Sequence, residues 1–279
     1  METFKQQCLD LRKAGHTLTE IVKITGRPKT SIYFHINSIP LSEEKIRLIR
    51  IASGIRARNI ALSRRGKSER QFRRFNKWSS NTVSLLGHLI FDGSIIRTSC
   101  IYNNRNISLI NKVENSMKNI YDHKPKRWIN NETGVSRISY HNVALGTYLQ
   151  EKSKELLNNI CSLSIGLKKE FLKAFFNDEG CIDFRPKRNL RQIRGYQKDK
   201  SILFLIQKLL CDFGIESRVV NPNEIVISGK ENLQKFQKRI GFSPGVYING
   251  NRSNSIWKKS LEKKVLLNEA IKSFKLPSH

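Results

Sequence analysis

The sequence predicts an α+β protein with an all-helical N-terminal part, followed by a repeated α+β unit. In residues 1–41, apolar residues recur at helical spacing, without a strand-like alternation. From about residue 81, an apolar helix that ends in an acid and a glycine, followed by a strand-like stretch, occurs twice. The 279 residues, 38% of them hydrophobic, are enough for two or three domains with real cores.

The N-terminal part of the chain is predicted to contain three helices. Apolar residues at helical spacing form a first helix that ends at Gly15. Thr17 can cap a second helix, with Glu20 at the capping-box position, and Gly26 breaks this helix. Pro28 stands where a third helix begins. Helix, short turn with glycine and helix together are the layout of a DNA-reading helix-turn-helix.

The segment HTLTEIVKITGRPKTSIYFHINSIPLS is similar to the helix-turn-helix of many small DNA-binding proteins. In that layout the third helix enters the major groove through its N-terminal residues. A three-helix packing module that touches nothing is the alternative. The residues expected to contact DNA are Lys29, Thr30, Ser31 and His35.

The charge of the chain favours a polyanionic partner. Lys and Arg total 51 against 23 acids, a formal net charge of +28. Residues 42–80 are predicted as a basic helical linker, whose charge run from Arg56 to Lys77 is opposed only by Glu69. A run with so few acids favours phosphate contacts over a merely solvated face. The linker residues expected to contact DNA are Arg64, Arg65, Arg73 and Arg74.

Other classes of protein are disfavoured by the sequence. No apolar run approaches the ~20 residues that cross a bilayer, and the N-terminus does not resemble a signal peptide. The five scattered cysteines form no CxxC pair, so neither a zinc site nor a disulfide framework is indicated. We expect a cytoplasmic, free-standing protein with reduced thiols and no membrane partner.

The two repeated stretches carry the candidate chemistry. They read LLGHLIFDGSI and LKAFFNDEGCI, and each glycine after the acid suits a left-handed helix cap. Small residues in third place, Gly87 and Ala174, would let the two helices approach closely and bring Asp92 near Glu179. Two adjacent carboxylates repel, and Mg²⁺ between them would relieve the repulsion. Such a site fits metal-assisted phosphodiester hydrolysis, whereas two buried helices with capping acids are the alternative.

These paired stretches resemble the two motifs of single-chain LAGLIDADG homing endonucleases, over roughly residues 81–250. The resemblance implies a monomer with a pseudo-twofold pair of αββαββα units, residues 81–167 and 168–250. Residues 251–279 then form a C-terminal basic helical tail. The resemblance also implies that Asp92 and Glu179 hold Mg²⁺ or Mn²⁺ and that each helps to cut one strand of double-stranded DNA. Asp178 precedes the matched position and is interpreted as a neighbour.

In the second unit, apolar and polar residues alternate after the motif, as in a half-buried strand. A turn, the strand LRQIRGYQ, a helix ending at Gly214, the strands SRVV and EIVIS and the helix ENLQKFQKRIGF follow. In the family the polar sheet face reads bases; Arg suits guanine and Gln suits adenine. A solvated sheet face is the alternative. The expected contacts are Asp183, Arg185, Lys187, Gln192 and Arg194.

The first unit repeats this pattern more tersely. Strands 95–98 and 100–103, a helix 107–121, the hairpin RWINNETGVSRISY and a helix 143–160 are predicted. Because Arg127 and Arg137 flank apolar residues of the hairpin, we expect both to project toward DNA.

The family usually places a Gln and a basic residue around the metal-bound water. Gln197 and Lys198 stand there in the second unit, whereas Asn103 replaces the Gln in the first. A further basic residue is expected after the last helix of each unit. Lys168 or Lys169 is the candidate in the first, but GFSPGVYINGNRSN offers no Lys in the second. His88, within the first motif, is expected to pack with its ring hydrogen-bonded.

The favoured function is a site-specific double-stranded DNA endonuclease, because both motif acids are retained. One alternative is a non-cleaving transcriptional regulator with a degenerate LAGLIDADG domain. Another is an RNA-binding intron maturase, although the helix-turn-helix argues for duplex DNA.

Overall fold

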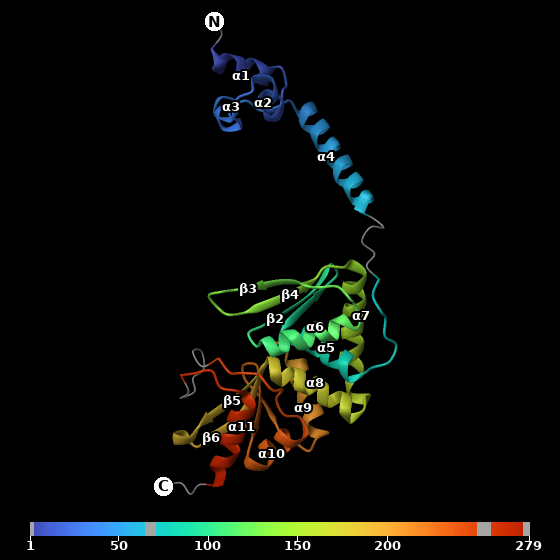
Figure 1. Cartoon of the computed structure of the whole chain (residues 1–279), viewed down its shortest axis with the longest axis vertical. Helices are drawn as coiled ribbons and strands as arrows, with labels where there is room; N and C mark the ends of the chain where they lie inside the picture. Colours follow the sequence, from blue (N-terminus) through green and yellow to red (C-terminus); the bar gives the residue numbers. More distant parts are fainter. Residues whose placement is uncertain (1–2, 65–70, 250–257, 276–279) are drawn as a thin grey trace. The chain divides into compact units, whose positions relative to one another are not determined.

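The computed structural model describes residues 3–64, 71–249 and 258–275 (Figure 1). The chain forms two compact units, residues 1–69 and residues 70–279, which are described separately below.

The N-terminal unit packs α1 (Phe4–Lys13), α2 (Leu18–Thr25) and α3 (Lys29–Ile36) around a small core. The expected capping box of α2 is confirmed: Glu20 N donates to Thr17 Oγ1 at 3.3 Å, and Thr17 N donates to Glu20 Oε2 at 2.7 Å. Gly26 ends α2 with a left-handed φ of 64°. The buried core side chains are Cys8, Ile21, Ile32 and Ile36.

The expected helical linker is helical only in part. α4 (Glu43–Arg64) is one continuous helix, but residues 71–79 form none. In this stretch Phe72, Phe75 and Trp78 pack against the core of the second unit. The Phe75 backbone also donates to Tyr148 Oη at 2.7 Å and accepts from the same hydroxyl at 2.9 Å. This packing favours an extended path over a helix.

The second unit contains two αββαββα halves, as the sequence predicted. The first half comprises α5 (Ser80–Phe91), β1 (Gly93–Ile96), β2 (Ser99–Asn104), α6 (Ile107–Lys118), β3 (Lys126–Ile129), β4 (Ser136–Tyr140) and α7 (Val143–Asn159). The second half comprises α8 (Ile165–Asp178), β5 (Gly180–Arg185), β6 (Leu190–Tyr196), α9 (Lys200–Cys211), β7 (Arg218–Val220), β8 (Glu224–Ser228) and α10 (Lys230–Arg239).

The two halves share one sheet topology. Within the described residues each half has one antiparallel four-stranded sheet, ordered β1-β2-β4-β3 in the first and β5-β6-β8-β7 in the second. Figure 1 shows α5 and α8 adjacent between the two halves, and these helices form the main contact between them. Their carboxyl ends therefore lie where the first strand of each sheet begins.

Small residues let α5 and α8 approach closely, as expected. A Cβ added to Gly87 would lie 2.8 Å from the Ala174 Cβ, closer than real Cβ contacts. The glycines after the acids have another role than the predicted one, because neither has a left-handed backbone. A Cβ on Gly93 would lie 2.6 Å from the Leu89 oxygen, and one on Gly180 would lie 2.3 Å from the Phe176 oxygen. Glycine is required there by close backbone approach.

After α10 the chain returns to the helix pair. Residues 245–248 and 260–263 run antiparallel, with Ile248 N donating to Leu261 O at 2.9 Å. This pair of segments, called the strap below, also contacts the first half: Ser108 Oγ donates to Gly245 O at 2.8 Å, and Tyr247 N donates to Asn106 Oδ1 at 2.8 Å. The helix that follows, α11 (Lys263–Lys272), packs against β5 and α10.

The described helices include none with the length and apolar character needed to cross a bilayer.

Candidate active site and nucleic-acid interface

Two acids end the paired helices. Asp92 is the C-cap of α5 and Glu179 is the C-cap of α8. Burial and the nearby Asp178 charge together raise the pKa of Asp92 to about 7. Burial likewise raises the pKa of Glu179 to about 8, with contributions from Asp92 and Asp178. The structure therefore brings both acids together in a setting that disfavours two negative charges.

Asp178 is more than a neighbour of these acids. Its side chain is 0% exposed and accepts a hydrogen bond from Tyr102 Oη at 2.7 Å. The His88 Nδ1 lies 2.8 Å from Asp178 Oδ2, and the His88 side chain is 1% exposed. Within the described residues His88 Nε2 has no hydrogen-bond partner. The expected hydrogen bond of His88 thus exists, and its acceptor is on the other motif helix.

Asn104 connects this buried pair to Asp92. Its Nδ2 donates to Asp92 Oδ2 at 2.7 Å and lies 3.2 Å from Tyr102 Oη and 3.4 Å from Asp178 Oδ1. We call His88, Tyr102, Asn104 and Asp178 the polar cluster. Asn103 contacts the acid residue only through its backbone, where its N donates to Asp92 O at 3.3 Å. The side chain that contacts the Asp92 carboxylate is therefore that of the next residue along the strand, Asn104.

Strand register explains this shift. In the second half, Tyr196 N donates to Glu179 O at 3.2 Å, as Asn103 N does to Asp92 O. Tyr196 thus corresponds to Asn103, and Gln197 corresponds to Asn104. The Gln197 side chain instead accepts from Asp199 N at 3.5 Å, and Lys198 is exposed. Neither makes a described contact with the acids.

The basic residue that the second half was expected to lack is Lys263, at the start of α11. Its Nζ is buried and donates to Asn177 O at 2.6 Å and to Phe176 O at 3.2 Å, in the last turn of α8. Burial lowers the pKa of Lys263 to about 8, against the attraction of surrounding anionic groups that include Asp92 and Glu179. A lysine in a first helical turn opposes the helix dipole, which is a sequence signal that could have found it.

Lys168 and Lys169 do not reach the acids. Lys168 Nζ is paired with Asp212 Oδ2 at 2.7 Å. Both lysines are in the first turns of α8, whose C-cap is Glu179. At a rise of about 1.5 Å per residue, ten residues of helix place Lys169 roughly 15 Å from that end.

A groove of about 980 Å³ opens beside the site. Its lining includes Asp92, Asn104, Asp178 and Lys263, together with strap residues such as Tyr247. The groove continues along β5, β6 and β8, where Asp183, Arg185, Arg194 and Glu224 also line it. A substrate chain in this groove would contact Asp92 and the second sheet together.

The expected base-reading residues of the second sheet share its open face. Asp183 pairs with Gln192, and Cys181 pairs with Arg194, so Asp183, Arg185, Gln192 and Arg194 all lie on one face. The opposite face carries the buried Ile182, Phe184 and Ile193. Lys187 is exposed in the turn between β5 and β6.

The two hairpin arginines of the first sheet lie on opposite faces. Arg137 pairs with Asn103 and Trp128, and it is exposed on the same open face as these residues. Arg127 pairs with Ile138, which faces the core, and its guanidinium is paired with Glu114 of α6. The two arginines therefore do not share one side as expected, because alternation along paired strands puts Arg137 on the open face and Arg127 on the face that packs against α6.

In the N-terminal unit, Lys29, Thr30 and Ser31 form the exposed first turn of α3. His35 is half-buried, with its ring edge against Phe4 at 5.6 Å between centroids.

The predicted linker contacts lie partly within the described residues. Arg73 and Arg74 are exposed, and the Arg74 guanidinium lies over the Phe72 ring at 5.8 Å. Arg65 and the side chain of Arg64 lie outside the described residues.

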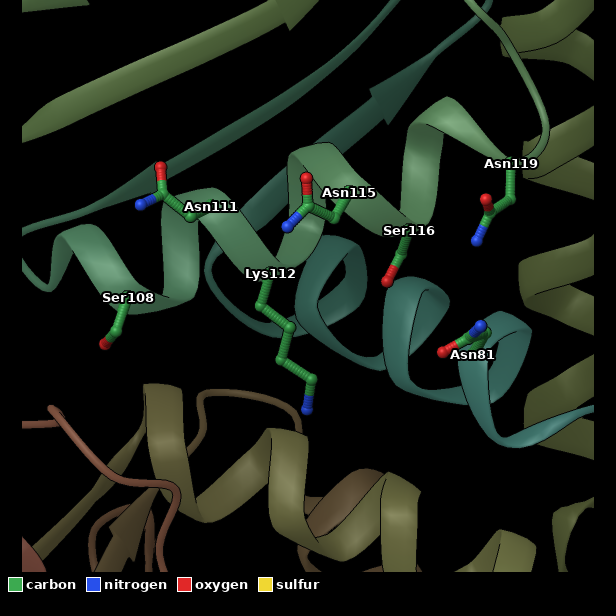
Figure 2. Close-up of a pocket in the computed structure, with 7 residues that line it drawn as sticks. All are labelled: Asn81, Ser108, Asn111, Lys112, Asn115, Ser116 and Asn119. Carbon is green, nitrogen blue, oxygen red and sulfur yellow. The ribbon is translucent and has the colours of Figure 1, made fainter.

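A second hollow, of about 440 Å³, runs along α6 and is shown in Figure 2. Amides and hydroxyls line it, and Lys112 points from it toward α8, where its Nζ is 4.0 Å from Glu170. Since none of its described lining residues is a carboxylate or a histidine, this hollow lacks the groups that hydrolysis needs.

Residues 166–241, which span α8 to α10, match the model of the LAGLIDADG-like domain family. Residues 166–241 therefore carry a LAGLIDADG-like domain. Among solved structures, the homing endonuclease I-DmoI in complex with DNA and Mn is 18% identical, covering 58% of this chain and 96% of that chain, with a TM-score of 0.44. Full-length WhiA from Thermatoga maritima is 15% identical, covering 74% of this chain and 64% of that chain, with a TM-score of 0.49. A search of curated proteins found no match.

Proposed function

We propose that this LAGLIDADG protein is a site-specific, metal-dependent endonuclease of double-stranded DNA. The observation that carries the proposal is the pair Asp92 and Glu179 at the joined ends of α5 and α8. Their pKa values are raised to about 7 and about 8 because burial and the charges of neighbouring acids, among them Asp178, disfavour both carboxylates. Carboxylates held in this way are typical of functional sites rather than of helix caps.

The residues present fit a hard divalent cation. Asp92 and Glu179 offer carboxylate oxygens, which Mg²⁺ prefers. Within the described residues no group of three or more His, Cys, Asp or Glu is arranged to hold a metal. A bound Mg²⁺ or Mn²⁺ would complete its shell with water and substrate phosphate oxygens, and it would supply a more acidic water and a counter-charge for the phosphate.

The chain's own groups prepare this chemistry. Asn104 donates to Asp92 Oδ2 at 2.7 Å and fixes the direction of that carboxylate. Lys263 offsets part of the negative charge from its position under the end of α8. Burial of the acids favours a neutral form until a cation is present, so the site is matched to binding metal together with an anionic substrate.

The remainder of the chain is proposed to hold duplex DNA. The formal net charge of +28 attracts phosphates without regard to sequence. The exposed first turn of α3 would enter the major groove like the recognition helix of a helix-turn-helix, and the open faces of both sheets present Arg137, Arg185 and Gln192. Sequence recognition would therefore come from two separate modules.

A DNA-binding regulator without cleavage is the second candidate. It is favoured by one observation: Gln197 and Lys198, which should surround a catalytic water at Glu179, make no described contact with the acids. Such a protein would keep the DNA-binding faces and the metal ligands but would lack an organised water at one acid.

The test is cleavage of a randomised duplex library with Mg²⁺ or Mn²⁺. The control is the Asp92→Asn/Glu179→Gln double variant, which retains the shape of both side chains. Cutting that disappears in the double variant supports the endonuclease. Specific retention of duplexes without cutting, at adequate protein and metal, favours the regulator instead.

A further inference from the structure

The open face of the second sheet carries a chain of alternating charges. In order, Arg185, Asp183, Arg194 and Glu224 contact one another through their side chains. Asp183 is at the centre of this chain, and its side chain is only 7% exposed. A carboxylate buried to this degree requires charged partners, and both arginines supply them.

Asp183 holds Arg185 by one side of the guanidinium. Arg185 Nε donates to Asp183 Oδ1 at 2.7 Å, and Arg185 Nη2 lies 3.2 Å from Asp183 Oδ2. Both residues are on β5, two positions apart, so they share one face of the strand. This two-point grip fixes the plane and the direction of the guanidinium.

Arg194 is held from two directions. Its Nη1 lies 3.2 Å from Asp183 Oδ2, while its Nε donates to Glu224 Oε2 at 2.9 Å and its Nη2 is also paired with Glu224. Three of its nitrogen atoms are therefore committed to protein carboxylates. Arg194 therefore holds Asp183 and keeps two of its five N–H groups free, one fewer than Arg185.

Arg185 retains the donors that recognise a guanine. A guanidinium has five N–H groups, and the grip on Nε and one side of Nη2 leaves the end formed by Nη1 and Nη2. Two parallel donors at that end match the O6 and N7 acceptors of guanine in the major groove. Arg185 also lines the open groove beside the acids, and its side chain is 21% exposed.

Another arginine of the same strand pair shows a different environment. Arg191 pairs with Phe184 on the core-facing side, its Nε donates to Ser273 Oγ at 2.6 Å, and its guanidinium lies 4.9 Å from the Phe274 ring centroid. Arg191 thus anchors the C-terminal helix. Of these two arginines, it is Arg185 that is held by a carboxylate and also lines the open groove.

We propose that Arg185 reads one guanine in the DNA target and that Asp183, supported by Arg194 and Glu224, is its positioning residue. This inference rests on the proposed binding of duplex DNA, whether or not the DNA is cut. It narrows the expected role of the sheet: Asp183 orients a base-reading side chain and does not itself contact a base. Loss of a two-point contact to guanine reduces discrimination at that base by about 10- to 100-fold.

The experiment selects bound duplexes from a randomised library with the full chain in EDTA, so that binding is measured without cutting. Wild type is compared with Arg185→Lys, which keeps the positive charge but cannot form the planar two-donor contact. The matched control is Arg188→Lys, in the exposed turn between β5 and β6. Far-ultraviolet circular dichroism and thermal unfolding verify that each variant is folded.

We expect wild type and Arg188→Lys to select the same site, and Arg185→Lys to lose preference for guanine at one position only. The salt dependence of binding should stay the same, because the charge is retained. Asp183→Asn should weaken the preference at that same position, and this would assign the positioning role.

Unchanged base preferences in folded Arg185→Lys would overturn the inference while leaving DNA binding intact. Loss of preference at every position together would also contradict it, since Arg185 would then act through the fold. If wild type enriches no duplex at all, the proposed function fails, and the inference fails with it. The wild-type selection therefore separates the two failures.

Discussion

Two equivalent contacts between α5 and α8 have the same backbone plan and opposite chemistry. His88 of α5 faces Asp178 of α8 through a 2.8 Å contact. The equivalent pair is Phe175 of α8 and Phe91 of α5, whose rings meet edge to face with centroids 5.1 Å apart. One of these two contacts is thus polar and directional, whereas the other is apolar.

The two sheets also differ where they meet these two contacts. Tyr102, which donates to Asp178, pairs with Gly93 at the start of the first sheet, and Gly195 pairs with Gly180 at the same place in the second. A Cβ on Gly195 would lie 2.5 Å from the Phe175 ring. In the first half the sheet supplies the large Tyr102 side chain next to the polar pair. In the second half the sheet has Gly195 at that position, and the large side chain there is Phe175 of the helix.

The difference reaches the two acids. Through Asn104 the polar cluster fixes the Asp92 carboxylate, while within the described residues the Glu179 carboxylate receives no hydrogen bond. A pseudo-twofold fold therefore contains two unequal sites. Asp92 is oriented before any substrate binds, and Glu179 would be oriented by its ligands.

The largest expected effect is on cleavage. Asp92→Asn and Glu179→Gln each should lower cleavage of one strand by at least about 100-fold, because each removes a charge that stabilises the reacting phosphate through metal. DNA affinity should remain near that of wild type. Gel analysis of nicked and linear plasmid would measure the cleavage of each strand. Unchanged cutting in both variants would contradict the site assignment.

Breaking the polar pair should have the next largest effect. Asp178→Ala leaves the His88 ring and the Tyr102 hydroxyl buried without their acceptor, and we expect a loss of about 3–5 kcal/mol in the free energy of unfolding. Urea denaturation measures this loss. The matched control, Asp92→Ala, removes a half-buried carboxylate and should not destabilise the protein to that extent.

Much of this comparison could be predicted from local sequence. The paired motifs, the small residues Gly87 and Ala174 and the strand alternation depend on neighbouring positions, and the structure agrees with each. The contacts of Asn104, Asp178 and Lys263 depend on register and on segments distant in the chain. Asn104 was missed because a one-residue shift in strand pairing exchanges it with Asn103, and Lys263 was missed because its chain returns from beyond α10.

Removing the hydrogen bond from Asn104 to Asp92 tests directly whether the two acids are held differently. Asn104→Ala should weaken Mn²⁺ binding about 10- to 100-fold, because a ligand-orienting hydrogen bond is lost. Gln197→Ala, at the equivalent position of the other half, should change Mn²⁺ affinity little. Isothermal titration calorimetry measures both. Equal effects of the two substitutions would mean that the two acids are held alike.

The pH dependence of stability should also reveal the strained acids. Since the folded-state pKa values of Asp92 and Glu179 are raised to about 7 and about 8, the folded protein holds more protons than the unfolded chain from about pH 4 upward. The contribution of these groups to stability is therefore present at low pH and is lost as pH rises toward 8.

The Asp92→Asn/Glu179→Gln double variant lacks these titrating groups. Its Tm should exceed that of wild type at pH 8 by several degrees, at about 2–4 °C per kcal/mol, and the difference should vanish below about pH 4, where the acids are protonated in both states. Scanning calorimetry without metal measures this difference. A wild-type Tm that is higher at both pH values would mean that the acids are not strained in the folded protein.

The smallest expected effect concerns two basic residues, Arg73 and Arg74, that precede the first αββαββα half. Arg73 and Arg74 are exposed on the segment that leads into α5, where the Arg74 guanidinium lies over the Phe72 and Tyr148 rings and both charges can meet phosphates. Replacing both with Gln should reduce the slope of log K against log salt by about 1.8, since each lost phosphate contact contributes about 0.9. Base preference should not change. Fluorescence anisotropy at several salt concentrations measures the slope, and an unchanged slope would indicate a solvated basic face. A reduced slope with unchanged preference would instead separate the affinity that this segment supplies from the sequence preference that α3 and the sheets are proposed to supply.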